Sequence, residues 1–373
     1  MMARRKKSLL SVLLSPPKRR PARRAMAPTR SVAAKSVKTA TTAIAKAIAP
    51  TLPKAPKTRP KAKKPVAATR PGGLGSWIES HYVGPAGSRG YFLYVPKGLP
   101  RTQVPLLVLL HGCSQTPAEF AAATRFNQQA DRQGFVVVYP HQTMAHNLNR
   151  CWNWFETRNQ SRLVGEPAII AGIVAQVAAA PSRRIDRSRI YVAGLSAGAS
   201  MALTLGATYP DVFAGIGVHS GPPYRSATGG AQALAAMGGR TQVPAVSETA
   251  YLAPGIGIPP TIVFQGTADF TVRAVNGSRV TDEWLAYRAA AVSGPADPER
   301  VTRSRVTPNA TGRRNSQVTR WYTARGRTCL ESWLVTGLGH AWSGGLAKGS
   351  FSDPLGPRAT TVMWRFLAAQ RLG

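Results

Sequence analysis

Acidic side chains are scarce in this sequence, in which 15 Asp and Glu stand against 49 Lys and Arg and give a formal net charge of +34. The imbalance is uneven, because residues 1–70 hold 20 of the basic residues and no acidic one. This segment also lacks aromatic residues and is rich in Ala and Pro. Since such a composition cannot bury enough apolar surface to offset the entropy of ordering it, we expect residues 1–70 to form a disordered basic tail.

Two interpretations of this basic tail stay open. It is either a solvated leader or linker, or a tether that binds a polyanion or a negatively charged granule surface. No aromatic residues interleave with its charges and no nucleic-acid-binding motif follows, which favours the linker.

The start of the chain, ARRKK before SLLSVLLS, has the positive charge of a secretion signal. Prolines and KRR follow it in place of a cleavage site, so it is no clean signal peptide. A cytoplasmic location is therefore an alternative to export.

Long apolar runs are lacking as well, and none approaches the ~18 residues that cross a membrane. We therefore expect no transmembrane segment.

The sequence has three cysteines, Cys113, Cys151 and Cys329, which permit one disulfide at most and show no metal-ligand spacing. We expect neither a metal nor another cofactor.

The rest of the chain alternates short β-rich runs with helical stretches from Tyr91 onward. The expected strands are residues 91–96, 105–112, 135–140, 189–195, 213–221, 260–266 and 331–340. The expected helices are residues 116–134, 166–180, 197–210 and 359–370. Thr116 is the expected N-cap of the first helix and Gly134 its end. This alternation predicts an α/β fold with a mostly parallel sheet and helices on both faces.

Two stretches do not fit this alternation. Residues 223–258 are small, polar and Pro-rich, which indicates an insertion over the top of the sheet. Residues 294–316 are predicted to be a long exposed loop.

The string IYVAGLSAGAS places Ser196 between an expected strand and an expected helix. This context is typical of a nucleophile elbow, in which Gly194 and Gly198 are needed because a side chain there would clash. The following helix points backbone N–H groups at a developing oxyanion. The alternative is a tight strand-to-helix connection of the nucleotide-binding kind, which lacks here its usual glycine fingerprint.

A nucleophilic serine needs a histidine base, and two histidines follow Ser196. His219 comes directly after the elbow helix and the next strand, which leaves little room for an acid between them, so we expect it to be a hydrogen-bonded residue near the site. His340 lies in VTGLGHAWSGG after a later apolar run and is the expected base.

The expected acid is Asp269, which stands just beyond the strand TIVFQG at the sheet edge where site residues gather. Three other aspartates compete less well. Asp211 follows the elbow helix as a turn residue, Asp282 lies within a helix, and Asp353 comes after the histidine.

An oxyanion hole needs a second backbone donor besides Ala197, and the loop after LLVLLHGCSQ is the expected source. The donor is the amide of Cys113 or, alternatively, that of Ser114. We expect His111 to be a packed histidine whose ring is satisfied by backbone groups.

The ordered set LLHGCSQT, ADRQGFVVVYP, CWNWF, IYVAGLSAGAS, PTIVFQGTADFTV with NGS, and GLGHAWSGG resembles the polyhydroxybutyrate depolymerase family of esterases, which are α/β-hydrolases. The resemblance covers roughly residues 75–370 and implies an esterase domain over residues 75–373. It implies a catalytic triad of Ser196, Asp269 and His340. Gln265, in place of a frequent His, and Ala199, in place of a frequent Gly, depart from the family pattern outside the triad.

The resemblance implies a serine esterase of the extracellular region that acts on short-chain 3-hydroxyalkanoate esters, either oligomers or amorphous polymer of polyhydroxybutyrate. A feruloyl or acetylxylan esterase would use the same triad. An alternative of another class is a binding protein that its basic tail tethers to a granule or to nucleic acid.

With that fold, three tryptophans near the motif loops, Trp152, Trp154 and Trp342, would form either an apolar platform for an acyl or polyester chain or part of the core. Cys113 and Cys151 would lie in strand-end loops, where they would be either bridged or buried as free thiols.

Overall fold

The structure is a computed structural model that describes residues 71–242, 257–291, 300–307, 313–323 and 325–373. The basic tail, residues 1–70, lies outside the described residues. Its expected disorder and its binding to a polyanion or granule surface therefore stay predictions. Among the helices of the described part, none is long and apolar enough to span a membrane.

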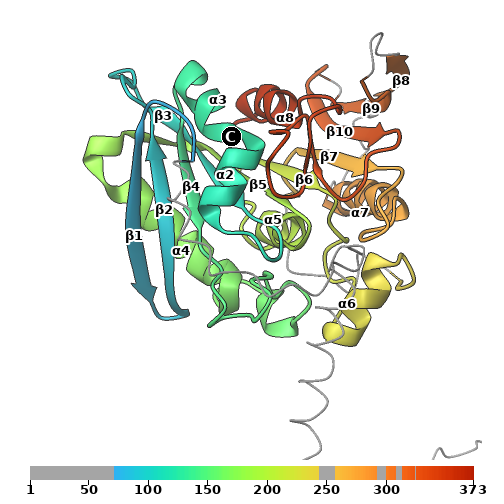
Figure 1. The fold of residues 1–373 in the computed structure, drawn as a ribbon, viewed down its shortest axis with the longest axis horizontal. Helices are drawn as coiled ribbons and strands as arrows, with labels where there is room; N and C mark the ends of the chain where they lie inside the picture. The colour runs from blue at the N-terminus through green and yellow to red at the C-terminus, as the bar shows by residue number, and fades with distance from the viewer. Residues whose placement is uncertain (1–70, 243–256, 292–299, 308–312, 324) are drawn as a thin grey trace, which may run out of the picture.

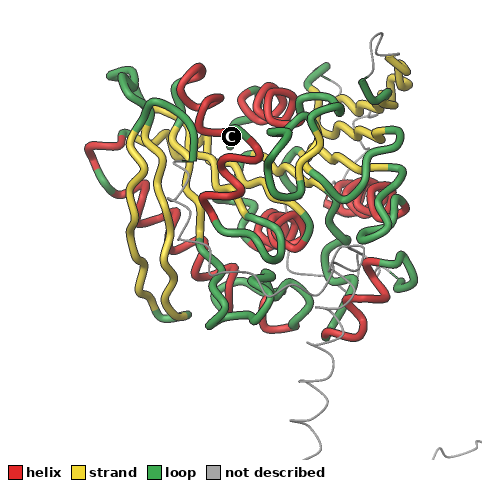
Figure 2. Tube along the Cα trace, in the orientation of Figure 1, coloured by secondary structure: helices red, strands yellow, loops and turns green. Residues whose placement is uncertain are grey.

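A large sheet runs through the molecule (Figures 1 and 2), with the strand order β1-β2-β4-β3-β5-β6-β7-β10-β9-β8. Its central strands, from β4 to β10 in that order, pair in parallel, whereas the pairs at both edges are antiparallel. The strands are β1 Ser76–Gly84, β2 Gly87–Val95, β3 Val104–Leu110, β4 Val136–Pro140, β5 Ile185–Leu195, β6 Gly215–His219, β7 Thr261–Gly266, β8 Arg300–Thr307, β9 Ser316–Tyr322 and β10 Thr328–Val335. A separate small pair consists of β11 Trp342–Ser343 and β12 Ser352–Asp353.

Helices cover both faces of the sheet (Figure 1), which confirms the predicted architecture. One face packs on α4, α5 and α7, and the opposite face packs on α2, α3 and α8. The described helices are α2 Pro117–Thr124, α3 Phe126–Gln133, α4 Gly165–Ala179, α5 Ala197–Thr208, α6 Gly230–Met237, α7 Val275–Ala291 and α8 Ala359–Ala368, with short 3-10 turns η1 Thr157–Asn159 and η2 Pro181–Arg183. The sequence of β3 is continuously apolar because the strand is buried on both faces. Leu106 and Val108 pack in the core on one face of the sheet, and Leu107 and Leu109 pack in the core on the other.

The helix expected over residues 116–134 is two helices. Its ends are as predicted: the Thr116 Oγ1 accepts the N–H of Glu119 at 3.3 Å in a capping box, and Gly134 has a left-handed φ of 70°. Arg125 interrupts the run with a φ of 61°, and its N–H closes α2 on the carbonyl of Ala121. An arginine is a good helix former, so the sequence carried no signal for this break.

The long loop expected over residues 294–316 is wrong for residues 300–307, which form β8 and pair with β9. This strand, RVTRSRVT, is an edge strand, and its basic residues mask the usual apolar pattern. No strand was expected over residues 76–84, which form β1 at the opposite edge, because its side chains are exposed or half-buried and it lacks the apolar run of a central strand. In the insertion expected over residues 223–258, residues 230–237 form α6, and residues 243–256 lie outside the described residues.

Candidate active site

Ser196 occupies a sharp turn between β5 and α5, with φ 57° and ψ −122°. A positive φ is strained for a residue with a side chain and is found where the surroundings enforce it. The Ser196 N–H donates to the carbonyl of His219 at 2.9 Å. A Cβ on Gly194 would lie 2.4 Å from backbone atoms of Gly198, and one on Gly198 would lie 2.2 Å from the carbonyl oxygen of Leu110. Both glycines are therefore needed for the close backbone approach at this turn.

Asp269 and His340 are brought together from the loops after β7 and β10, with 2.8 Å between Asp269 Oδ2 and His340 Nδ1. The other carboxylate oxygen accepts the backbone N–H groups of Thr271 at 3.0 Å and Val272 at 2.8 Å. An ionised carboxylate can only accept hydrogen bonds, so His340 Nδ1 carries the proton. The Nε2 of His340 is then left with a lone pair that can accept a proton.

Two cavities meet at Ser196. We call the one that His340 lines the histidine-side pocket and the other the apolar pocket. The described residues that line the histidine-side pocket are Gly112, Cys113, Leu195, Ser196, His340 and Phe351. Those that line the apolar pocket are Cys113, Cys151, Trp154, Phe155, Ser196, Ala197, Pro222, Ala233, Met237 and Val272. Ser196 and His340 thus border one cavity.

His219 is held in the core beside the site, as expected. Its Nε2 accepts the N–H of Ser343 at 3.1 Å, so the ring proton lies on Nδ1, which faces Ser220 Oγ at 3.1 Å. The ring is fully buried and stacks on Trp342 with 4.9 Å between centroids. Burial lowers the pKa of His219 to about 3, and repulsion from His340 acts in the same direction. Both ring nitrogens are engaged, so His219 is not available as a base.

The competing aspartates lie elsewhere. Asp211 forms an ion pair with Arg162, and Asp353 forms one with Arg314. Asp282 is exposed on α7.

The backbone N–H groups beside Ser196 differ in whether they already donate a hydrogen bond within the protein. The N–H of Ser114 donates to the carbonyl of Asn149 at 2.7 Å, which removes it from the choice of oxyanion donors. The N–H groups of Cys113 and Ala197 donate to no acceptor within the described ranges. Ala197 is the first residue of α5, where an N–H has no partner within the helix. These two amides are therefore available to an oxygen of a ligand.

His111 has the packing role expected for it. Its Nδ1 lies 2.8 Å from the carbonyl of Gly112, and its Nε2 lies 3.2 Å from the amide nitrogen of Gln142. Burial lowers its pKa to about 4. The neutral ring ties the loop after β3 to the loop after β4.

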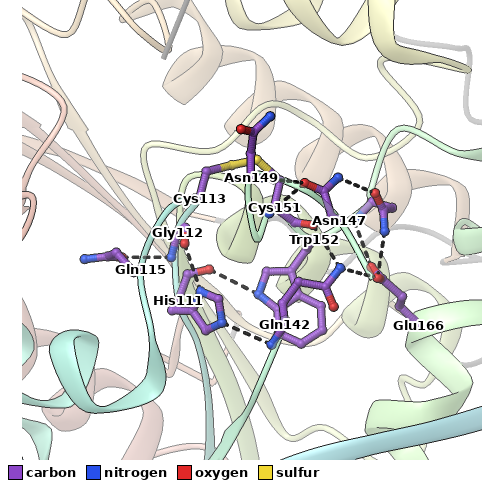
Figure 3. The surroundings of a disulfide bond; sticks show 11 residues. His111, Gly112, Cys113, Gln115, Gln142, Asn147, Asn149, Cys151, Trp152 and Glu166 are labelled. Carbon is purple, nitrogen blue, oxygen red and sulfur yellow. Dashed lines mark hydrogen bonds between the residues drawn. A yellow bond between two sulfur atoms is a disulfide. The ribbon is translucent and has the colours of Figure 1, made fainter. Parts of the chain in front are cut away.

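Cys113 and Cys151 form a disulfide, which settles the open alternative in favour of the bridge (Figure 3). Close to it, the buried carboxylate of Glu166 accepts a hydrogen bond from the Gln142 side chain at 2.6 Å (Figure 3) and one from the Asn153 backbone at 2.7 Å. Arg89 lies 3.6 Å from the same carboxylate. The sequence carried no signal for this cluster, because Glu166 and Arg89 are of residue types that are mostly exposed.

The three tryptophans do not share one role: one lines a pocket at Ser196, and the other two belong to the core. Trp154 lines the apolar pocket. Trp152 and Trp342 have no exposed surface and line neither pocket; their indole N–H groups donate to the His111 carbonyl and to Thr360 Oγ1. For these two the expectation of a substrate platform is corrected to core packing.

The parallel sheet, the strained serine after β5 and the Asp–His pair after β7 and β10 together form the framework of an α/β-hydrolase. The family described as "Esterase PHB depolymerase" matches residues 89–308. The chain belongs to this family.

Two relatives and one solved structure extend this comparison. The chain is 33% identical to poly(3-hydroxyalkanoate) depolymerase C of Paucimonas lemoignei over 68% of this chain and 58% of the relative. It is 30% identical to poly(3-hydroxybutyrate) depolymerase of Ralstonia pickettii over 69% of this chain and 52% of the relative. The chain thus spans a little over half the length of both relatives. An acetyl xylan esterase from Aspergillus awamori has the same fold, with a TM-score of 0.60 and 21% identity over 79% of this chain and 100% of that chain.

Proposed function

We propose that the chain is a serine esterase in which Ser196 is the nucleophile, His340 the base and Asp269 the residue that orients it. The observation that carries this proposal is the 2.8 Å contact of His340 Nδ1 with Asp269, beside a pocket that His340 and Ser196 both line. The contact leaves His340 Nε2 free to take the Ser196 hydroxyl proton. A serine hydroxyl without such a base is a weak nucleophile.

In the first half-reaction, Ser196 Oγ bonds to the ester carbonyl carbon while its proton passes to His340 Nε2. The N–H groups of Cys113 and Ala197 donate to the oxyanion that forms. The bond from this carbon to the alcohol oxygen then breaks, and His340 Nε2 gives its proton to the departing alcohol. The acyl group stays on Ser196 as an ester.

In the second half-reaction, His340 Nε2 takes a proton from water, and the hydroxide oxygen bonds to the acyl carbon. Collapse of this intermediate breaks the bond to Ser196 Oγ, which takes the proton back from His340. The products are a carboxylic acid and the free serine. Each step uses a proton that this chain or water supplies.

The proposed substrates are esters of short-chain 3-hydroxyalkanoates, as oligomers or amorphous polymer of polyhydroxybutyrate. The names of the two depolymerase relatives support this choice. A feruloyl or acetylxylan ester is the alternative substrate, because the same triad would hydrolyse it.

The experiment compares wild type, Ser196→Ala and Ser182→Ala on p-nitrophenyl butyrate, amorphous polyhydroxybutyrate and methyl ferulate. Ser182 is the matched control, since it lies exposed in η2 before β5, at the end of that strand opposite to Ser196. We expect wild type and Ser182→Ala to hydrolyse the butyrate and the polymer, and Ser196→Ala to lose at least 10³-fold in kcat.

Turnover of methyl ferulate alone would keep the mechanism and replace the substrate. Equal rates of wild type and Ser196→Ala on every ester would overturn the role of Ser196, and no turnover by either protein would favour a binding protein. In that case, deletion of residues 1–70 would test whether the basic tail attaches the chain to granules or nucleic acid.

A further inference from the structure

The two pockets that meet at Ser196 differ in the chemistry of their linings. His340 contributes an ionisable ring to the histidine-side pocket. Among the described residues around the apolar pocket, none carries a charge, and its wall consists of the disulfide and mainly apolar side chains. Cys113 and Ser196 border both pockets, so an ester carbonyl that bonds to Ser196 Oγ and accepts from the Cys113 and Ala197 amides lies where the two pockets meet.

The direction of proton transfer decides which half of an ester enters which pocket. In the proposed reaction His340 gives its proton to the oxygen of the departing alcohol. That oxygen must therefore lie within hydrogen-bond reach of His340, on the side of the histidine-side pocket. The acyl chain then points away from His340 and enters the apolar pocket.

Part of the wall of the apolar pocket is contributed by α6, the helix within the insertion between β6 and β7. Ala233 and Met237 of this helix line the pocket and are 2% and 9% exposed. They stand one helical turn apart, so both side chains face the same way. In Figure 1, α6 lies beside the end of α7 and apart from the sheet.

Helix α6 is fixed to the segment that carries the proposed acid. The carbonyl of Met237 accepts the N–H of Arg273 at 2.9 Å and the side-chain amide of Asn276 at 2.9 Å. Val272, which donates to Asp269, lines the same pocket. The position of Met237 is thereby set by the same segment that positions Asp269, which makes α6 a fixed wall.

We propose that Ala233 and Met237 are the residues that determine acyl-chain length, with the apolar pocket taking an uncharged, short acyl chain and α6 stopping longer ones. This inference rests on the proposed function. It follows that added bulk on this face of α6 shortens the acyl chain that fits, whereas removal of bulk lengthens it.

The experiment measures kcat/KM on p-nitrophenyl acetate, butyrate, hexanoate and octanoate. Ala233→Leu should lower the ratio of hexanoate to acetate turnover at least tenfold, and Met237→Ala should raise the ratio of octanoate to butyrate turnover at least fivefold. Ala231→Leu is the matched control, because Ala231 is on the same helix, is exposed and lines neither pocket. Thermal unfolding verifies that each variant is folded. If Met237→Ala does not fold, Ala233→Leu still tests the proposal.

Unchanged chain-length ratios in Ala233→Leu, or the same change in Ala231→Leu, would overturn the assignment of α6. Ser196→Ala separates this outcome from failure of the proposed function. If Ser196→Ala is inactive while Ala233→Leu keeps the wild-type ratios, the esterase mechanism stands and the acyl-pocket assignment fails. If Ser196→Ala retains full activity, both fail.

Discussion

His340 Nδ1 lies 2.8 Å from Asp269 Oδ2, while Asp269 Oδ1 is held by two backbone N–H groups. This fixed carboxylate determines which ring nitrogen of His340 carries the proton. In Asp269→Asn, the amide oxygen would keep the backbone contacts and the NH₂ group would face His340. The ring would then be protonated on Nε2 and could no longer accept the serine proton. We expect kcat to fall about 10⁴-fold, measured on p-nitrophenyl butyrate.

The control for this variant is Asp211→Asn, the same substitution in a half-exposed carboxylate that pairs with Arg162. It should leave kcat within twofold of wild type. Comparable kcat values for Asp269→Asn and wild type would contradict the assigned role of Asp269.

The disulfide between Cys113 and Cys151 is expected to affect both catalysis and stability, because Cys113 is one of the two proposed oxyanion donors and both cysteines line the apolar pocket. The bridged residues are 38 positions apart, for which loop-closure entropy predicts about 4 kcal/mol of stabilisation. We expect Cys151→Ala to lower the free energy of unfolding by that order and kcat at least tenfold, since the Cys113 amide loses its covalent support. Urea unfolding and ester kinetics measure the two effects.

Cys329→Ala is the matched control, because Cys329 is buried, takes no part in the disulfide and lines neither pocket. A reducing agent should lower kcat of the wild type and leave kcat of Cys151→Ala unchanged. Wild-type kcat in Cys151→Ala would mean that the bridge does not position the amide.

The sequence predicted the central strands and the elbow because both have strong local signals. In β3 the continuous apolar run follows from burial on both faces, and at Ser196 the flanking glycines follow from backbone contacts that no side chain allows. Edge strands lack that signal: three arginines interrupt any apolar run in the sequence of β8, and charged residues are typical of an edge strand. The sequence carried no signal for the Glu166 cluster either, since Glu and Arg are mostly exposed residue types and Arg89 meets the other members only in the fold.

Glu166 holds the loop after β4 by accepting hydrogen bonds from Gln142 (Figure 3) and Asn153. Its carboxylate also lies 3.6 Å from the buried Arg89. Its replacement by alanine would leave the Arg89 charge without a counterion in the core. We expect Glu166→Ala to lower the free energy of unfolding by about 3–5 kcal/mol, measured by urea titration. Glu156→Ala, which breaks the exposed pair with Arg158, should cost about 1 kcal/mol or less. Equal losses in the two variants would contradict a special role for the buried pair.

Glu283 on α7 gives the protein a pH-dependent stability. Burial raises the pKa of its carboxyl to about 8, although the N–H of Tyr224 donates to it at 3.1 Å and acts in the opposite direction. The folded state therefore keeps this proton to about pH 8, whereas the unfolded chain releases it near pH 4.5. Between these values the folded state binds more protons, so stability falls as the pH rises, by up to about 1.4 kcal/mol per pH unit.

A glutamine at this position keeps the carbonyl acceptor and never ionises. We expect the free energy of unfolding of Glu283→Gln to exceed that of wild type by a margin that grows from pH 5 to pH 8 and becomes constant above it. Urea titrations at pH 5, 6.5, 8 and 9 measure the margin, and Asp282→Asn, the neighbouring exposed carboxyl on α7, is the control. A margin that is independent of pH would show that Glu283 is ionised in the folded protein across this range, so that its burial does not hold the proton.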